Sequence, residues 1–214
     1  MKKLVSMILA LVMVLSLAAC GAKGENETTA PETTAPVETT VPVENTEAPT
    51  ETGAPAVEAT GAAAVLENIW AKYGDDEKFA IFGGNPEAMN MDVPGNWDMA
   101  YAEGMSYNLL VPAEQLESID EAASMIHMMN ANTFTCGLFH LTEGTDKTAF
   151  ADAMRSAVQG NQWMCGFPET LVIANIGEYV LVAFGLNDAM NPFLTHMTEA
   201  YADAEILYNE AIAG

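Results

Sequence analysis

Apolar residues recur along residues 62–214 with two kinds of spacing, which predict helices and strands. A spacing of three to four residues places side chains on one face of a helix. It predicts helical segments over residues 66–73, 113–130, 146–159 and 191–211. The second segment is either one helix or, if Ser118 and Glu121 form a capping box, two helices over 113–117 and 119–130.

Short and nearly continuous apolar runs predict strands. The clearest runs are rich in β-branched and aromatic residues and cover 133–141, 170–174 and 179–184. Weaker runs cover 79–82 and 107–111. Gly177 lies between the last two clear runs and can take a positive φ at no steric cost, which predicts a hairpin. Because both runs of this hairpin are apolar throughout, we expect both of their faces to be covered.

The order of these elements predicts an α+β fold. From residue 133 onward the order is β-α-β-β-α, after a helical N-terminal part. This order indicates a small mixed or antiparallel sheet with helices packed against it. If strand 133–141 connects through helix 146–159 to a parallel neighbour at 170–174, these two strands start at the same edge of the sheet. The segment 83–96 is rich in Gly, Asn and Pro, which indicates a long irregular loop.

Residues 1–20 have the layout of a secretory signal peptide. Lys2 and Lys3 precede an apolar stretch over 4–17 that is too short to span a bilayer comfortably. Small residues then lead to Cys20 in the sequence Leu-Ala-Ala-Cys. This ending resembles the lipobox of bacterial lipoproteins, in which the cysteine takes lipid and becomes the mature N-terminus. The resemblance implies that acyl chains such as palmitate on Cys20 hold the protein on the extracytoplasmic face of the cell membrane.

Residues 21–61 are expected to be a disordered linker. The unit Glu-Thr-Thr-Ala-Pro recurs imperfectly from Glu27 onward, and aromatic residues are absent. Regularly spaced proline blocks helix and sheet ladders, and the interleaved glutamates repel one another. The segment therefore suits an extended stalk, and its threonines could also carry O-linked sugar.

Residues 62–214 are then expected to form a single α+β domain. Together, the lipobox, the stalk, the β-α-β-β-α unit and its hairpin resemble small lipoproteins of Gram-positive, clostridia-like bacteria that carry a domain of unknown function. The residues that carry this resemblance are Cys20 and the run from Glu178 to Phe184 that follows Gly177. The resemblance implies a location and no particular activity.

The negative charge of the chain limits the kinds of molecule that the domain can bind. Residues 62–214 hold 22 acidic residues against four basic ones, which gives a formal charge of −18. Such a domain repels phosphate backbones and anionic lipid headgroups, so we expect no nucleic-acid partner. The charge suits solubility on an exposed surface, and it is also compatible with a cationic ligand or a metal.

Cys136 and Cys165 are the thiols that remain after lipidation of Cys20. Two cysteines in an extracytoplasmic protein suggest a disulfide, and the shared sheet edge expected above would bring them together. The alternative is two free thiols, one of them buried as a small hydrophobe. Catalysis would require a histidine partner, for which His140 and His196 are available. His140 lies ~13 Å from Cys136 along the predicted strand, too far for a hydrogen bond.

Two further stretches carry side chains that can bind metals. Met125, His127, Met128 and Met129 have thioether and imidazole groups that suit copper(I), although a Met-lined core is the simpler interpretation. The acidic residues 75–77 lack the alternating ligands of a calcium loop, which fits a helix end or a solvated surface. We therefore expect no metal and no cofactor.

Trp163 and Phe167 lie in a turn-rich stretch before a buried strand. Such aromatic residues either close the edge of the core or, if exposed, form a partner patch. The sequence thus predicts a non-catalytic binding or accessory module that contacts an envelope protein or a small-molecule ligand. The alternative is a cell-envelope enzyme, or a thiol or copper-type protein, that uses Cys136, Cys165 and the nearby histidines.

Overall fold

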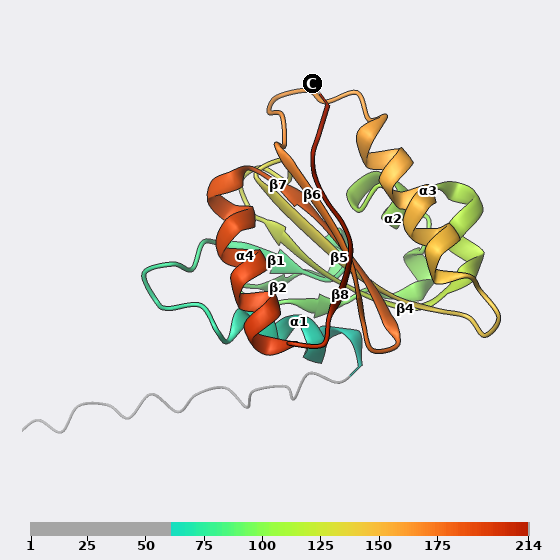
Figure 1. Ribbon diagram of the computed structural model, residues 1–214, viewed down its shortest axis with the longest axis horizontal. Coiled ribbons are helices and arrows are strands. Elements are labelled where there is room, and N and C mark those ends of the chain that lie inside the picture. The colour runs from blue at the N-terminus through green and yellow to red at the C-terminus, as the bar shows by residue number, and fades with distance from the viewer. Residues whose placement is uncertain (1–60, 214) are drawn as a thin grey trace, which may run out of the picture. The chain divides into compact units, whose positions relative to one another are not determined.

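The computed structural model of the chain describes residues 61–213, which form an antiparallel sheet packed with helices (Figure 1). The α+β fold predicted from the sequence is thereby confirmed. The signal peptide, the lipobox with Cys20 and the stalk lie outside the described residues, apart from Gly61 at the end of the stalk.

The sheet has eight strands in the order β2-β1-β4-β5-β7-β6-β8, and β3 pairs with β4 beside β1. All pairings are antiparallel. The strands are β1 (Ile81–Gly83), β2 (Asn90–Met91), β3 (Gly95–Asn96), β4 (Ile119–His127), β5 (Phe134–Leu141), β6 (Thr170–Ile176), β7 (Tyr179–Gly185) and β8 (Glu205–Ala211).

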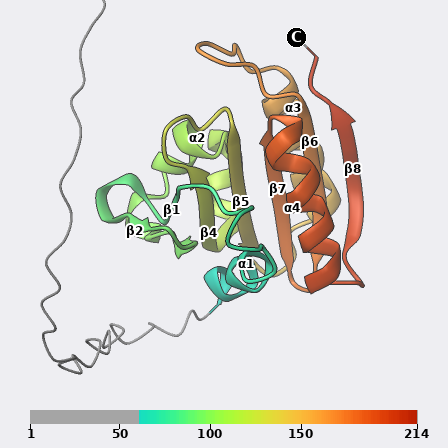
Figure 2. The same cartoon turned by 90° about the vertical axis from the view of Figure 1, so that its left-hand side faces the viewer.

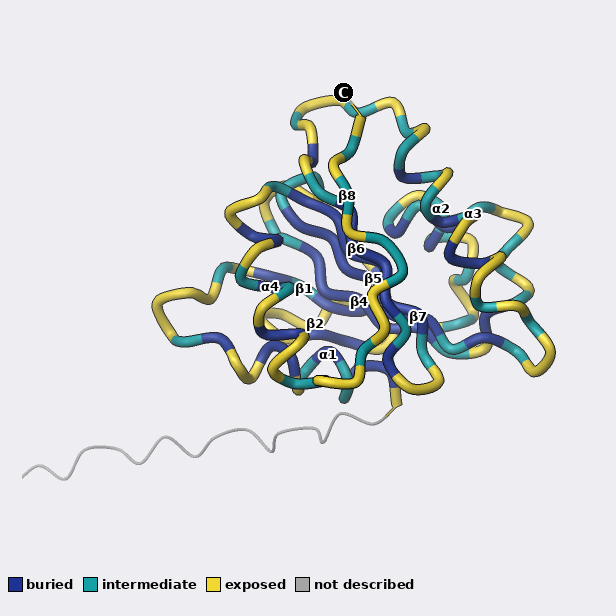
Figure 3. The backbone as a smooth tube through the Cα atoms, viewed as in Figure 1, coloured by how far each residue is buried: buried dark blue, intermediate teal, exposed yellow. Residues whose placement is uncertain are grey.

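Helices cover both faces of the sheet. The α-helices are α1 (Ala62–Trp70), α2 (Gly104–Asn108), α3 (Lys147–Gln159) and α4 (Asn187–Ala200), and short 3-10 turns cover Pro86–Ala88, Met99–Tyr101 and Ala113–Ser118. α1 and α4 pack on one face, and α2 and α3 pack on the other (Figures 1 and 2). Each face therefore has its own hydrophobic core, and the central strands between them are buried (Figure 3).

Four predicted elements agree with the structure. The strands expected at 133–141, 170–174 and 179–184 correspond to β5, β6 and β7, and the helix expected at 146–159 corresponds to α3. β6 and β7 are buried on both faces, as their uniform apolarity predicted. Asp146 starts α3 because its carboxylate accepts hydrogen bonds from the backbone N–H groups of Thr148 and Ala149.

The helix expected over 119–130 is wrong, because this segment forms strand β4. β4 pairs with β5 along one side and with β1 and β3 along the other. Residues 122–126 of this strand are all buried, so apolar side chains face both sides of the sheet and match a helical spacing by chance. In the strand, Ile119 and Ile126 face the α3 side, whereas Ala123 faces the α1 side.

The last predicted helix is wrong in its second half. α4 ends at Ala200, and the chain then turns and returns as the edge strand β8 beside β6. Contacts with α3 hold this strand: the Tyr208 hydroxyl bonds to Asp152, and the Arg155 guanidinium donates two hydrogen bonds of 2.7 and 2.8 Å to Glu210. These contacts join residues more than 50 positions apart, so the local apolar spacing does not report them.

Three weaker predictions also change. The strand expected at 107–111 is wrong, since Tyr107 belongs to helix α2. The helix expected at 66–73 begins earlier and ends at Trp70. The parallel pairing of 133–141 with 170–174 is wrong as well, because β7 lies between β5 and β6 and is antiparallel to both.

Helix α1 begins against the sheet, and side chains from two strands complete its first turn. The backbone N–H of Ala62 donates to Glu121 Oε1 at 2.6 Å, and that of Ala63 donates to Asn96 Oδ1 at 2.9 Å. The first N–H groups of a helix have no partner within it, and a carboxylate at this end also favours the helix dipole. β3 and β4 therefore cap α1 in place of a local capping residue.

Candidate functional site

The turn between β4 and β5 and the loop between α3 and β6 carry exposed apolar side chains. Met129 in the turn is 82% exposed, and in the loop Met164 is 76% and Phe167 is 63% exposed. The loop projects beyond the sheet, at the end where the chain also finishes (Figures 1 and 2). We call Met129, Met164 and Phe167 the loop patch.

Two asparagines of the turn hold the loop in place. Asn130 Nδ2 donates to the carbonyl oxygen of Cys165 at 3.1 Å. Asn132 Nδ2 donates to the carbonyl oxygens of Met164 at 3.0 Å and Gly166 at 3.1 Å. These amides satisfy three consecutive loop carbonyls, which fixes the backbone under the loop patch.

His127 fixes the turn in its own right. Its Nδ1 accepts hydrogen bonds from the backbone N–H groups of Met129 at 3.2 Å and Asn130 at 3.3 Å. Its ring stacks on Phe79 with centroids 5.5 Å apart. Burial lowers the pKa of His127, because desolvation penalises the charged ring. A neutral ring with Nδ1 as acceptor is the form that these two donors require.

The loop also contains a strained residue. Cys165 has a φ of +62°, a conformation that costs a residue with a side chain about 1–2 kcal/mol. A non-glycine residue keeps such a backbone only where its surroundings impose it. The hydrogen bonds from Asn130 and Asn132 supply that constraint at Cys165 and at both of its neighbours.

The structure separates the two aromatic residues of the predicted partner patch. Trp163 is half-buried and packs on Phe184 of β7, with ring centroids 5.4 Å apart. Its ring closes the edge of the α3-side core, and its buried Nε1 has no hydrogen-bond partner among the described residues. Phe167 instead faces solvent. Trp163 thus fastens the loop to the core, and Phe167 is the member of this pair that a partner can reach.

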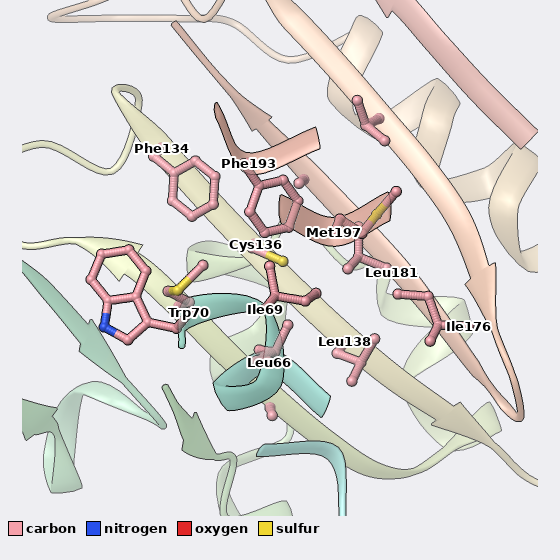
Figure 4. Close-up of a cluster of buried hydrophobic side chains, with 14 of the residues drawn as sticks. Leu66, Ile69, Trp70, Phe134, Cys136, Leu138, Ile176, Leu181, Phe193 and Met197 are labelled. Carbon is pink, nitrogen blue, oxygen red and sulfur yellow. The ribbon is translucent and has the colours of Figure 1, made fainter. Parts of the chain in front are cut away.

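The structure does not contain the disulfide predicted between Cys136 and Cys165. Both are free thiols: Cys165 is exposed, whereas Cys136 is fully buried between the sheet, α1 and α4 (Figure 4). Burial raises the pKa of the Cys136 thiol. The prediction depended on a parallel pairing of strands that β7 prevents.

A thiol-modification experiment separates these states. We expect N-ethylmaleimide, without reductant, to add one adduct to the native protein carrying Cys20→Ser, because only Cys165 is accessible. A second adduct, on Cys136, should follow only in denaturant. Intact mass and peptide mapping give the readout. If both cysteines resist the reagent in denaturant and react only after a reductant is added, the protein contains the disulfide after all.

The histidines proposed for cysteine catalysis have other partners. His140 Nδ1 lies 2.5 Å from Asp120 Oδ1. His196 lies between two carboxylates, with Nδ1 3.1 Å from Glu199 and Nε2 3.4 Å from Glu77. No hydrogen bond joins a cysteine to a histidine within residues 61–213, so this part of the chain does not assemble the expected pair.

The copper-type and calcium stretches also have structural roles. Met125 is buried in the core, Met129 faces solvent, and His127 Nδ1 is engaged by the turn. Glu77 accepts a hydrogen bond from the Gly74 N–H at 3.0 Å, within a turn that follows α1, and residues 75–77 are exposed. In the described part of the chain, no group of three or more His, Cys, Asp or Glu side chains is placed to hold a metal.

Comparison with known proteins finds no matching family model, curated protein or solved structure. Of the helices between residues 61 and 213, none is long and apolar enough to cross a membrane.

Sequence reasoning missed two members of the loop patch. Met129 was expected on the buried side of a helix. In the structure, β4 ends at His127, and Met129 lies exposed in the turn that follows. Nothing in the sequence around Met164 indicated that its side chain would be exposed. The available signal was the pair Asn130 and Asn132, because asparagines in a turn often bond to nearby backbone.

Proposed function

We propose that this protein is a membrane-anchored, non-catalytic binding module that contacts an envelope protein through the loop patch. The observation that carries the proposal is the ordered exposure of Met129, Met164 and Phe167. Exposed apolar side chains that gather in one place are typical of interaction sites. Here they stand on a backbone fixed by Asn130 and Asn132.

A fixed backbone supports binding because fewer degrees of freedom are lost when a partner arrives. The three side chains also suit a protein partner in their chemistry. Phe167 is a rigid aromatic group that can fill a pocket, and the two methionines adapt to an irregular surface. A strained residue at a ligand-binding loop, here Cys165, is a recurrent feature of functional sites.

The location forms the second part of the proposal. Lipid on Cys20 would hold the chain at the membrane, and residues 21–61 would act as the stalk. The charge of −18 on residues 62–214 would keep the domain away from anionic headgroups. An apolar patch on such a domain is then better suited to a protein partner than to the lipid surface.

Site-specific photo-crosslinking in the producing cells tests the function. A photoreactive phenylalanine analogue replaces Phe167 in the full anchored chain, and in separate variants it replaces Met164 and Ile206. Ile206 is an exposed apolar control on β8. We expect Phe167 and Met164 positions to give the same crosslinked protein, identified by mass spectrometry, and the Ile206 position not to give it.

The crosslink must also depend on the patch. Met129→Ser should weaken it when the analogue is at Phe167, while circular dichroism of the purified variant stays unchanged. Absence of any patch-specific adduct, or the same adducts from Ile206, would contradict the proposed function. With residues 1–20 replaced by a signal peptide that is cleaved without lipidation, the protein should leave the membrane fraction, and its retention there would contradict the anchor.

A further inference from the structure

A cleft of about 400 Å³ lies between the 3-10 turn Pro86–Ala88 and the segment that leads into α2. Its lining includes two tyrosines, one methionine, two carboxylates and one amide, namely Glu87, Met99, Tyr101, Glu103, Tyr107 and Asn108. We call this the tyrosine cleft. It does not include any residue of the loop patch, so its function is independent of the one proposed above.

We propose that the tyrosine cleft binds a small organic cation, such as a quaternary ammonium group. Tyr101 is 49% and Tyr107 is 86% exposed, so both offer ring surface to a ligand. The π-face of a tyrosine ring attracts a cation, and recognition of choline-like groups commonly uses such rings. Glu87 and Glu103 add negative charge to the same lining.

The carboxylates of the cleft are not neutralised by the protein itself. From residue 79 to residue 146 the sequence contains no Lys and no Arg. The four basic side chains of residues 62–214 lie elsewhere: Arg155 pairs with Glu210, Lys147 with Glu178, and Lys78 lies over the Trp70 ring, while Lys72 follows α1. A net charge of −18 further raises the local concentration of cations.

The cleft has a firm base. Buried Trp97 donates from Nε1 to the carbonyl oxygen of the lining residue Tyr101 at 3.1 Å. The Asp98 carboxylate accepts from the Ala100 N–H at 2.9 Å, and Asn108 Nδ2 donates to the Gly104 carbonyl oxygen at 2.8 Å. Buried Asn85 donates to Glu87 Oε2 at 3.3 Å, which orients that carboxylate.

An organic cation fits this lining better than two other ligand classes. A calcium ion takes six to eight oxygen ligands, and the cleft offers two carboxylates. A neutral sugar could stack on the tyrosines and donate hydroxyl hydrogens to the two carboxylates, but it would gain nothing from their negative charge. The negative charge of Glu87 and Glu103 therefore favours a cation over a neutral ligand.

Calorimetric titration of the full mature chain, kept soluble by Cys20→Ser, tests the proposal with choline as the probe. The control ligand is 3,3-dimethyl-1-butanol, which has the same shape without the charge. We expect choline to bind about tenfold more tightly than this alcohol. Tyr107→Leu should weaken choline binding about fivefold, whereas Tyr107→Phe should retain it because the ring remains.

Charge is tested by a matched pair of variants. Glu103→Gln should weaken choline binding about threefold, while Glu143→Gln removes an exposed charge elsewhere and should leave it unchanged. Equal affinity for choline and the alcohol, no saturation by choline up to about 50 mM, or indifference to Tyr107→Leu would each overturn the proposal. Tyrosine-dependent binding of a neutral oligosaccharide in place of choline would overturn it in favour of a glycan site.

Discussion

Replacing Phe134 by alanine is expected to lower the free energy of unfolding by about 4 kcal/mol. Phe134 is fully buried at the start of β5, on the face covered by α1 and α4. Its ring meets the rings of Phe79 and Phe193 edge to face, with centroids 5.4 and 5.1 Å apart. Truncation removes both ring contacts and leaves a cavity. β5 cannot move to close this cavity, because it is paired with β4 on one side and with β7 on the other. Urea denaturation followed by circular dichroism measures the loss.

The matched control is Phe167→Ala, which removes the same side chain from an exposed position. We expect it to change stability by no more than about 0.5 kcal/mol. A similar loss for both variants would show that Phe167 packs into the fold. The loop patch could not then be a free surface, so this comparison also bears on the proposed function.

Replacing Gly83 by alanine is expected to cost about 3 kcal/mol or more. A Cβ at this position would lie 2.1 Å from the backbone nitrogen of Gly95 and 2.3 Å from the carbonyl carbon of Pro94. Both atoms belong to backbone, which cannot move aside as a flexible side chain can. β1 and β3, which both pair with β4, would have to separate. Urea denaturation measures the loss, and faster amide exchange at Trp97, whose N–H bonds to Ala122, would locate it.

Gly177→Ala serves as the control for Gly83→Ala. Gly177 has a φ of +56° in the β6–β7 turn, and a Cβ there would meet no atom within 4 Å. We expect a cost of about 1 kcal/mol from backbone strain alone. If Gly83→Ala were no worse than this control, the close approach of the two strands would not be required by the fold.

Much of the domain's architecture could be predicted because some segments have only one way to bury their side chains. β6 and β7 are apolar at nearly every position and joined by a glycine, so a buried hairpin was the simplest solution. Asp146 and Gly160 bound α3 with ordinary helix-end chemistry. β4 was mistaken for a helix because burial on both faces removes the alternation that identifies a strand.

The candidate sites were less predictable, since their members come from distant parts of the chain. Asn130 and Asn132 reach loop carbonyls 32 to 35 residues away. Trp163 and Phe167 are four residues apart and were expected to be either both buried or both exposed. Trp163 packs on β7, whereas Phe167 faces solvent. Nothing in the local sequence indicated which side of the loop each residue would occupy.

The sequence by itself determined the α+β class, strands β5 to β7, helix α3 and the strong negative charge of the domain. Each depends on composition or on contacts between residues close in the chain. The tertiary structure decided that 119–127 and 205–211 are strands, that Cys136 and Cys165 lie apart, and that Met129, Met164 and Phe167 are exposed. These features depend on which strands become neighbours, because strand pairing decides what each face is covered by and which loops meet at the end of the sheet.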